Sequence, residues 1–330
     1  EMCIRDSMWV ALYGKHNRFD HNHLEGKSNR GVTLAVRRNS EESLQNHHRI
    51  DHNYFGPRPI LGSNGGETMR IGTSHESLSD SFTLVENNYF DRCNGEVEII
   101  SAKSGSNTFR GNLFFESRGT LTLRHGNNNV VENNVFFGNR VDHTGGICVI
   151  NKGQIIRNNY MHGLTGHRFG GGFVVMNGVP DSVINRYHQV DNALIENNTI
   201  IDTDHIEFAA GADEERSAPP INSVFRNNLL YNSDGSDNIS VHDDVSGIEF
   251  ANNSMLQKIE LAKGENGLLY PTDPELAGIG VRRDLKVLDR DDTGVTWYPK
   301  AGFGDRFEGG ETHSIEAVSY THLRAHETGV

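Results

Sequence analysis

A short pattern of apolar and polar residues recurs along most of the chain. In each copy an apolar residue is followed by two variable positions, an asparagine, one further position and a second apolar residue. Self-similarity of this kind is typical of repeat architectures, in which each unit buries its apolar face against its neighbours. The repeated asparagine occurs at Asn22, Asn53, Asn88, Asn112, Asn134, Asn159, Asn198, Asn228 and Asn253.

The spacing of these asparagines describes a short unit with insertions. Successive copies are 22 to 39 residues apart, and the basic unit has 22–25 residues. Within the units, apolar residues alternate over short runs such as 107–115 and 129–137, which is the period of a β-strand, and no unit sustains a helical period. We therefore predict an all-β fold, a right-handed parallel β-helix, in which loops of varied length interrupt a solenoid.

The repeated asparagine has a structural explanation in such a solenoid. Strands of neighbouring coils lie about 4.8 Å apart, so asparagines at the same turn can pass hydrogen bonds from one side-chain amide to the next. The backbone turns a left-handed corner at the same place. We therefore predict an asparagine ladder. Leucine-rich repeats also carry a periodic asparagine, but their leucine spacing is absent, and a propeller needs a longer, four-stranded unit.

The same pattern sets the expected domain limits. It supports a β-helix over residues 8–257, whose N-terminal coils we expect to be missing, and it stops before a charged, proline-containing segment at 258–316. That segment shows no second core and is expected to be a C-terminal cap or linker. The two ends, 1–7 and 317–330, resemble translated read-through of sequencing adapters, so we expect them to be non-native.

Composition narrows the possible partners. The 330 residues include 34 Asn and 36 Gly, which favours turns over long helices. Lys and Arg number 31 against 44 Asp and Glu, a formal charge of −13. We expect no nucleic-acid partner, because phosphate binding requires a basic face. We also expect no membrane partner, because no apolar run reaches the length of a membrane span.

The segment 95–104, GEVEIISAKS, is the strongest candidate for chemistry. Alternation along a strand places Glu96 and Glu98 on its outer face, away from the core. Val97 and Ile99 then point inward. Two neighbouring carboxylates repel each other unless a cation lies between them. An isolated pair of this kind is usually a solvated acidic face, so its significance depends on which residues the other coils place beside it.

The register of the repeat brings further polar residues to the same place. Measured from the repeated asparagine of their own coils, Asn64, Lys103, Arg124 and the two glutamates fall in one narrow stretch of three consecutive coils. We expect Asn64 and Arg124 to lie on one sheet beside Glu96 and Glu98, with Lys103 at its edge. Two carboxylates and an amide oxygen suit Ca²⁺, whereas zinc would favour cysteine or histidine ligands.

Five motifs occur together along the chain, namely SNGGETMRIG, GEVEIISAKS, LTLRHGNNN, GGICVINKG and NNYMHGLTG. In these motifs the sequence resembles polysaccharide lyase family six, which contains alginate lyases and chondroitinase B. The resemblance runs from about Met8 to about Ala301, and it implies a right-handed parallel β-helix. It also implies that Lys103 is the Brønsted base and Arg124 the Brønsted acid. Asn64, Glu96 and Glu98 would be the calcium ligands.

Two more residues are candidate substrate contacts, and one position departs from the family. Arg70, in ETMRIG, can bind a carboxylate, although an exposed arginine is usually only solvated. His125 would point into the coil if alternation continued beyond Arg124, but a strand end can turn it outward. Many family members carry an arginine where this chain has Cys148, so we expect weaker polymer binding or a different sugar preference.

Together these observations predict a secreted or periplasmic, calcium-dependent alginate lyase that cleaves an anionic polysaccharide by β-elimination. A dermatan or chondroitin sulfate lyase is one alternative, but sulfates would require additional basic clusters along the cleft. A non-catalytic glycan-binding β-helix is another, and it would need neither Lys103 nor Arg124. A glycoside hydrolase usually holds two carboxylates across the bond, whereas here both are expected at the ion.

Overall fold

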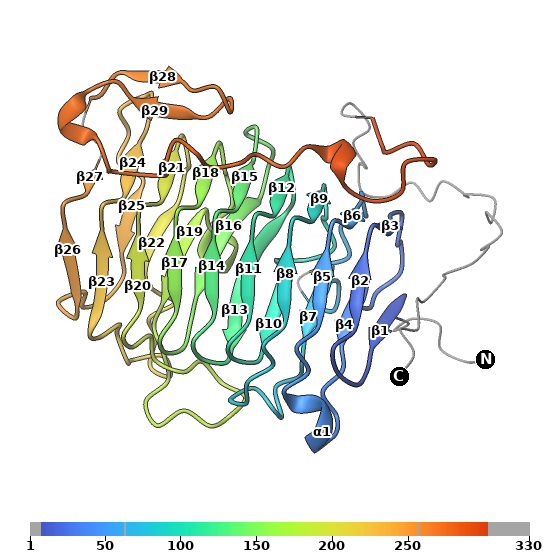
Figure 1. The fold of residues 1–330 in the computed structure, drawn as a ribbon. Coiled ribbons are helices and arrows are strands. Elements are labelled where there is room, and N and C mark those ends of the chain that lie inside the picture. Colours follow the sequence, from blue (N-terminus) through green and yellow to red (C-terminus); the bar gives the residue numbers. More distant parts are fainter. Residues whose placement is uncertain (1–7, 63, 256–257, 303–330) are drawn as a thin grey trace.

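The fold is a solenoid of stacked coils with three faces (Figure 1). The computed structural model describes residues 8–62, 64–255 and 258–302. Within these residues, the coils contribute their strands to three parallel sheets of nine strands each, which we name A, B and C. The expected right-handed parallel β-helix is therefore confirmed. The expected non-native ends, 1–7 and 317–330, lie outside the described residues, as do residues 303–316 of the C-terminal segment.

The strand order of each sheet follows the order of the coils. Sheet A contains β1 (Val10–Leu12), β4 (Leu34–Val36), β7 (Met69–Ile71), β10 (Glu98–Lys103), β13 (Gly119–His125), β16 (Thr144–Val149), β19 (Phe173–Met176), β22 (Ile206–Ala210) and β25 (Ile239–Val241). Sheet B contains β2 (Arg18–Asp20), β5 (Arg49–Asp51), β8 (Leu84–Glu86), β11 (Thr108–Arg110), β14 (Val130–Glu132), β17 (Ile155–Arg157), β20 (Leu194–Glu196), β23 (Ser223–Arg226) and β26 (Ile248–Ala251). Sheet C contains β3 (His23–Leu24), β6 (Tyr54–Phe55), β9 (Tyr89–Asp91), β12 (Leu113–Phe115), β15 (Val135–Phe137), β18 (Tyr160–His162), β21 (Thr199–Ile201), β24 (Leu229–Tyr231) and β27 (Ser254–Met255).

Helical structure is sparse in the described part of the chain. It comprises α1 (Glu41–Leu44) and the 3₁₀ turns η2 (Arg168–Gly170), η3 (Pro274–Leu276) and η4 (Arg290–Asp292). Among the described residues, no helix has the length and apolar character needed to cross a membrane.

The interior is built from columns of like residues, because equivalent positions of successive coils lie directly above one another. Phe55, Phe90, Phe114 and Phe136 form one such column, with neighbouring ring centroids 4.9, 4.7 and 4.4 Å apart. These rings are stacked nearly parallel and fully buried in the core. The alternating apolar residues of the sequence repeat are therefore the residues that fill the solenoid.

The asparagine ladder is present at all nine predicted positions. From Asn22 to Asn228, each asparagine uses its backbone N–H and Nδ2 to donate hydrogen bonds to Oδ1 of the ladder asparagine in the next coil, and Asn253 accepts the last pair. Between Asn112 and Asn134 both distances are 3.0 Å. The left-handed corner lies one residue before each ladder position, as at Asn133 with a φ of 58° and Asn158 with a φ of 54°.

The C-terminal segment lies along the side of the solenoid. After the antiparallel hairpin β28 (Leu261–Lys263) and β29 (Leu269–Pro271), the chain runs back across sheet C towards the first coils (Figure 1). Val281 donates a backbone hydrogen bond to the hydroxyl of Thr199, and Gly294 donates one to the carbonyl of His52. Its apolar residues pack against those of sheet C. The described part of the expected cap therefore covers one face of the solenoid.

Replacing Asn134 with alanine should destabilise the whole solenoid. Asn134 is fully buried, accepts from both amides of Asn112, and donates to the carbonyl of Phe109 and to Asn159. We expect a loss of about 2–4 kcal/mol, because several buried groups lose partners worth about 1 kcal/mol or more each. Denaturant unfolding monitored by circular dichroism measures this loss.

The matched control for that measurement is Asn127→Ala. Asn127 lies outside the ladder, and its side chain accepts one hydrogen bond, from the backbone N–H of Lys152, at the surface. Its replacement should cost less than about 1 kcal/mol. Equal losses for the two variants would show that the ladder has no special role in stability.

Candidate active site

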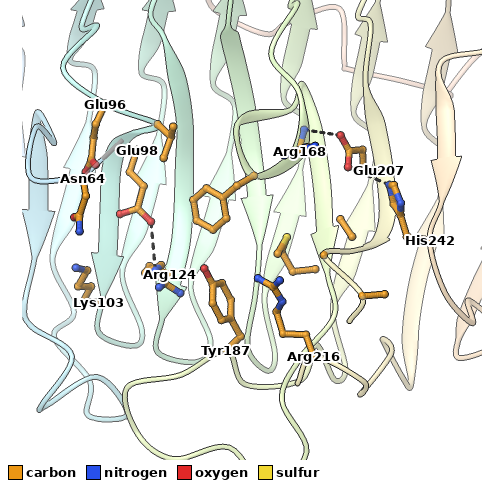
Figure 2. Close-up of a pocket in the computed structure, with 16 residues that line it drawn as sticks. Asn64, Glu96, Glu98, Lys103, Arg124, Arg168, Tyr187, Glu207, Arg216 and His242 are labelled. Atoms are coloured by element: carbon orange, nitrogen blue, oxygen red, sulfur yellow. Dashed lines mark hydrogen bonds and ion pairs between the residues drawn. The ribbon is translucent and has the colours of Figure 1, made fainter. Parts of the chain in front are cut away.

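A groove of about 730 Å³ on the outer face of sheet A is the candidate active site. Strands β10 and β13 border one end of it and β22 borders the other, while η2 and loops outside the sheet form its sides. Figure 2 shows the polar side chains that lie along it. Five of the seven site residues predicted from the sequence line this groove, namely Asn64, Glu96, Glu98, Lys103 and Arg124.

The pairing of strand β10 with β13 is irregular, and this irregularity affects which side chains of β10 face the groove. Relative to β13, its pairing shifts between Glu98 and Ile100 and again just before Lys103. Such irregularities are bulges, which change the direction of neighbouring side chains. Ile99 and Ile100 are both buried in the core, so the alternation expected from the sequence is interrupted. Val97, which was expected to face inward, lines the groove instead.

Three buried carboxylates meet at one end of the groove. Oxygens of Glu67, Glu96 and Glu98 all lie within 4.8 Å of one another. Glu98 opens β10, Glu96 precedes that strand, and Glu67 precedes β7 in the neighbouring coil. Figure 2 shows Asn64 beside Glu96 at the same end. Glu67 was missed in the sequence, although it follows Asn64 by three residues within the motif SNGGETMRIG.

The electrostatics of this carboxylate cluster favour a bound cation. Burial raises the pKa of Glu96 well above its usual range, and the charges of Glu67 and Glu98 raise it further. Burial also raises the pKa of Glu98. Oε2 of Glu67 is buried and has no hydrogen-bond partner among the described residues. Buried, unpaired oxygens of like charge are costly unless a cation compensates them, so these residues fit a hard divalent ion such as Ca²⁺.

Arg124 is held in place on several sides. Its Nε lies 3.5 Å from Oε1 of Glu98, and its guanidinium stacks 4.1 Å above the ring centroid of Tyr187 and 5.8 Å from that of Phe169. Cation–π contacts of this kind fix the plane of a guanidinium. Nη1 of Arg124 is buried, and no described residue accepts a hydrogen bond from it. The side chain is therefore held in a fixed position at the groove, with one buried N–H group left without an acceptor.

Lys103 ends β10 and lies one strand from Arg124, opposite His125 in the β-sheet register. No carboxylate among the described residues lies within ion-pairing distance of its amine. Lys103 lines the groove at the same end as the carboxylate cluster (Figure 2). An amine, a guanidinium and an acidic cluster thus face one space.

The other two predicted residues do not line the groove. Arg70 lies on β7, where its Nη1 is 3.9 Å from Oε1 of Glu67, on the far side of the acidic cluster. His125 is 1% exposed and lies beside the backbone of Arg186, in the loop between β19 and β20. Burial, together with the charges of Arg124 and Lys103, lowers the pKa of His125 to about 3, so its ring is neutral.

Cys148 lies beneath the aromatic residues of the groove. It pairs with Thr122 of β13 on the outer face of sheet A, but it is fully buried. Phe169 and Tyr187 cover the apolar cluster to which it belongs. Burial raises the pKa of its thiol, which is therefore protonated. Cys148, where the resemblance led us to expect an arginine, is therefore part of an apolar layer beneath the groove.

Comparisons with known proteins agree with this architecture. A family model described as chondroitinase B matches residues 4–275. The solved structure of the family 6 alginate lyase AlyGC is 65% identical, with a TM-score of 0.88, and the match covers 90% of this chain and 43% of that chain. This chain therefore spans less than half the length of AlyGC. A search of curated proteins found no match.

Two further solved structures are more distant. A mannuronic acid specific family 6 lyase from human gut microbiota is 36% identical with a TM-score of 0.68, over 74% of this chain and 55% of that one. The alginate lyase AlyF-OU02, in complex with G6, is 26% identical with a TM-score of 0.75, over 88% and 69% of the two chains. Because the family model covers most of the sequence and AlyGC is 65% identical over 90% of it, the chain belongs to polysaccharide lyase family 6.

Proposed function

We propose that this chain is the catalytic β-helix of a calcium-dependent alginate lyase, which breaks 4-linked uronate chains by β-elimination. The observation that carries the proposal is the convergence of Lys103, Arg124 and a buried carboxylate cluster at one end of a single groove. Alginate is favoured as the substrate because the similar solved structures include alginate lyases.

The chemistry sets three tasks for the site. The C5 proton of a uronate is very weakly acidic while the adjacent carboxylate is an unscreened anion. Asn64, Glu67, Glu96 and Glu98 would hold Ca²⁺, and the bound ion would supply positive charge to that carboxylate. The two remaining tasks are to remove the C5 proton and to stabilise and protonate the departing oxygen.

Lys103 is proposed to remove the proton. Its amine takes the proton from C5, the C4–C5 double bond forms from the released electron pair, and the bond from C4 to the linking oxygen breaks. Lys103 suits this role because it reaches the groove without an ion-pair partner among the described residues. General bases positioned in this way contribute about 10²–10⁴-fold to rates.

Arg124 is proposed to act on the departing oxygen. A guanidinium rarely gives up its proton, so its main contribution is to donate hydrogen bonds to the negative charge that develops there. The Arg124 side chain lines the groove and is 21% exposed, so part of its guanidinium can meet that oxygen. The oxygen then receives its proton from Arg124 or through water, which balances the proton taken by Lys103.

Replacing Lys103 with alanine should abolish the lyase reaction but preserve substrate binding. We expect wild-type protein to generate the absorbance of the unsaturated uronate from alginate, and the variant to be at least about a hundredfold slower. Lys152→Ala is the control, because Lys152 is an exposed lysine paired with Asp191 outside the groove. Undiminished activity in Lys103→Ala would remove the assigned base. Cleavage of dermatan sulfate but not alginate would favour the chondroitinase substrate instead.

Replacing Glu67 with glutamine should weaken calcium binding. This change removes one of three charges that surround the cation position while keeping the side chain's size. We expect the calcium Kd measured by calorimetry to rise at least about tenfold. Glu249→Gln, on the exposed part of β26, is the matched control and should leave the Kd unchanged. If the two variants bind calcium alike, Glu67 is no part of the cation site.

A further inference from the structure

The groove continues well beyond the residues assigned to the reaction. Arg124 lies on β13 and Glu207 on β22, three strands further along sheet A. Since neighbouring strands are about 4.8 Å apart, this separation along the sheet is about 14 Å. Figure 2 shows Glu207 with Arg168 and His242 at the end of the groove away from Lys103. The groove therefore has a second polar end.

Glu207 gives this second end a fixed geometry. Its carboxylate is buried, Oε1 accepts a hydrogen bond of 2.7 Å from the backbone N–H of Arg168, and Oε2 lies 3.1 Å from Nε2 of His242. The backbone of Arg168 has a φ of 54°, in the left-handed region that non-glycine residues adopt infrequently. Glu207 thus fixes the backbone of Arg168 and the ring of His242, two residues that line the groove.

Two arginines, Arg168 and Arg216, line this end of the groove, where Glu207 is the carboxylate that lines it. No described residue forms an ion pair with the guanidinium of Arg168, whose side chain is exposed in the groove. Arg216 pairs with Asp213 and stacks on Tyr187 at 5.6 Å, but its Nε is buried without a partner. In a chain of net charge −13, a polyanion can be attracted only by such local cations.

Apolar surface connects the two ends. Phe169, Met176, Tyr187 and Ala210 line the groove between Arg124 and the second end. Aromatic rings offer flat apolar faces on which the C–H faces of sugar rings can pack. The groove therefore alternates charge, apolar surface and charge, which matches a polymer that has an anionic group on each sugar.

We propose that Arg168 and His242, supported by Glu207, form a subsite for a uronate carboxylate about three sugars from the broken bond, with Arg216 on the path to it. This inference rests on the proposed function. The departing oxygen faces Arg124 and stays with the preceding sugar, so the sugars extending from Arg124 towards β22 lie on the non-reducing side. A 4-linked uronate advances the polymer by about one strand spacing per sugar.

The test compares oligouronates of defined length as substrates of Arg168→Gln and His242→Gln. For oligomers long enough to place three sugars on the non-reducing side, we expect kcat/KM to fall about tenfold, mainly through KM. Shorter oligomers should be cleaved at the wild-type kcat/KM. Arg157→Gln is the control, since Arg157 is an exposed arginine that donates to Glu132 on sheet B, outside the groove.

Two outcomes would contradict the proposed subsite. An equal loss of kcat/KM at every length would show a general disturbance of the fold, and no loss at any length would show that the sugars do not reach Arg168. If wild-type protein cleaves none of the oligomers, the proposed function fails, but the subsite can still be tested. Calorimetry with long and short oligomers should then show tighter binding of the long ones, lost in Arg168→Gln but not in Arg157→Gln.

Discussion

The fixed spacing between hydrogen-bonded strands decides which side chains of neighbouring coils meet in this structure. Every coil advances the solenoid by one strand, about 4.8 Å, and the asparagine ladder holds each coil to the next at the same corner. A residue's position within its coil therefore decides which residues of neighbouring coils it meets. Glu98 and Lys103 on β10 face Arg124 on β13 for this reason, although they come from different repeats. The site is a consequence of the stacking.

The acidic end of the groove buries like charges close together, which is unfavourable. Three carboxylates from two coils are buried within 4.8 Å, and burial raises the pKa values of Glu96 and Glu98. Such a cluster is stable as a set of anions only with compensating positive charge. A cation that binds the folded chain would also stabilise it by mass action, so the same residues that prepare the reaction would couple folding to calcium.

The repeat allowed the fold and much of the site to be predicted, because a fixed register converts sequence position into spatial position. Asn64, Glu96, Glu98, Lys103 and Arg124 were found in this way. The features that were missed depend on chain segments that leave the register. One is the bulge on β10 that buries two successive isoleucines. Other missed features lie in the insertions between repeats. These loops carry no repeat pattern, and their conformation depends on contacts with residues far away in the sequence.

Tyr187 shows why the contacts of the inserted loops could not be predicted from the sequence. It belongs to the loop between β19 and β20, and its ring reaches Arg124, which is 63 residues earlier in the sequence (187 − 124). The course of the C-terminal segment across sheet C was also unforeseen, because its apolar residues are sparse and match no repeat. In both cases the partner surface is formed by distant coils, so nothing local specifies the contact.

The central claim is that a divalent cation and Lys103 act together on a uronate in this groove. The most direct measurement is the formation of unsaturated product from alginate by wild-type protein after treatment with a chelator and after calcium is added back. The account predicts that the rate falls to background with chelator and returns with calcium, while circular dichroism shows that the protein remains folded. Full activity in excess chelator would contradict it.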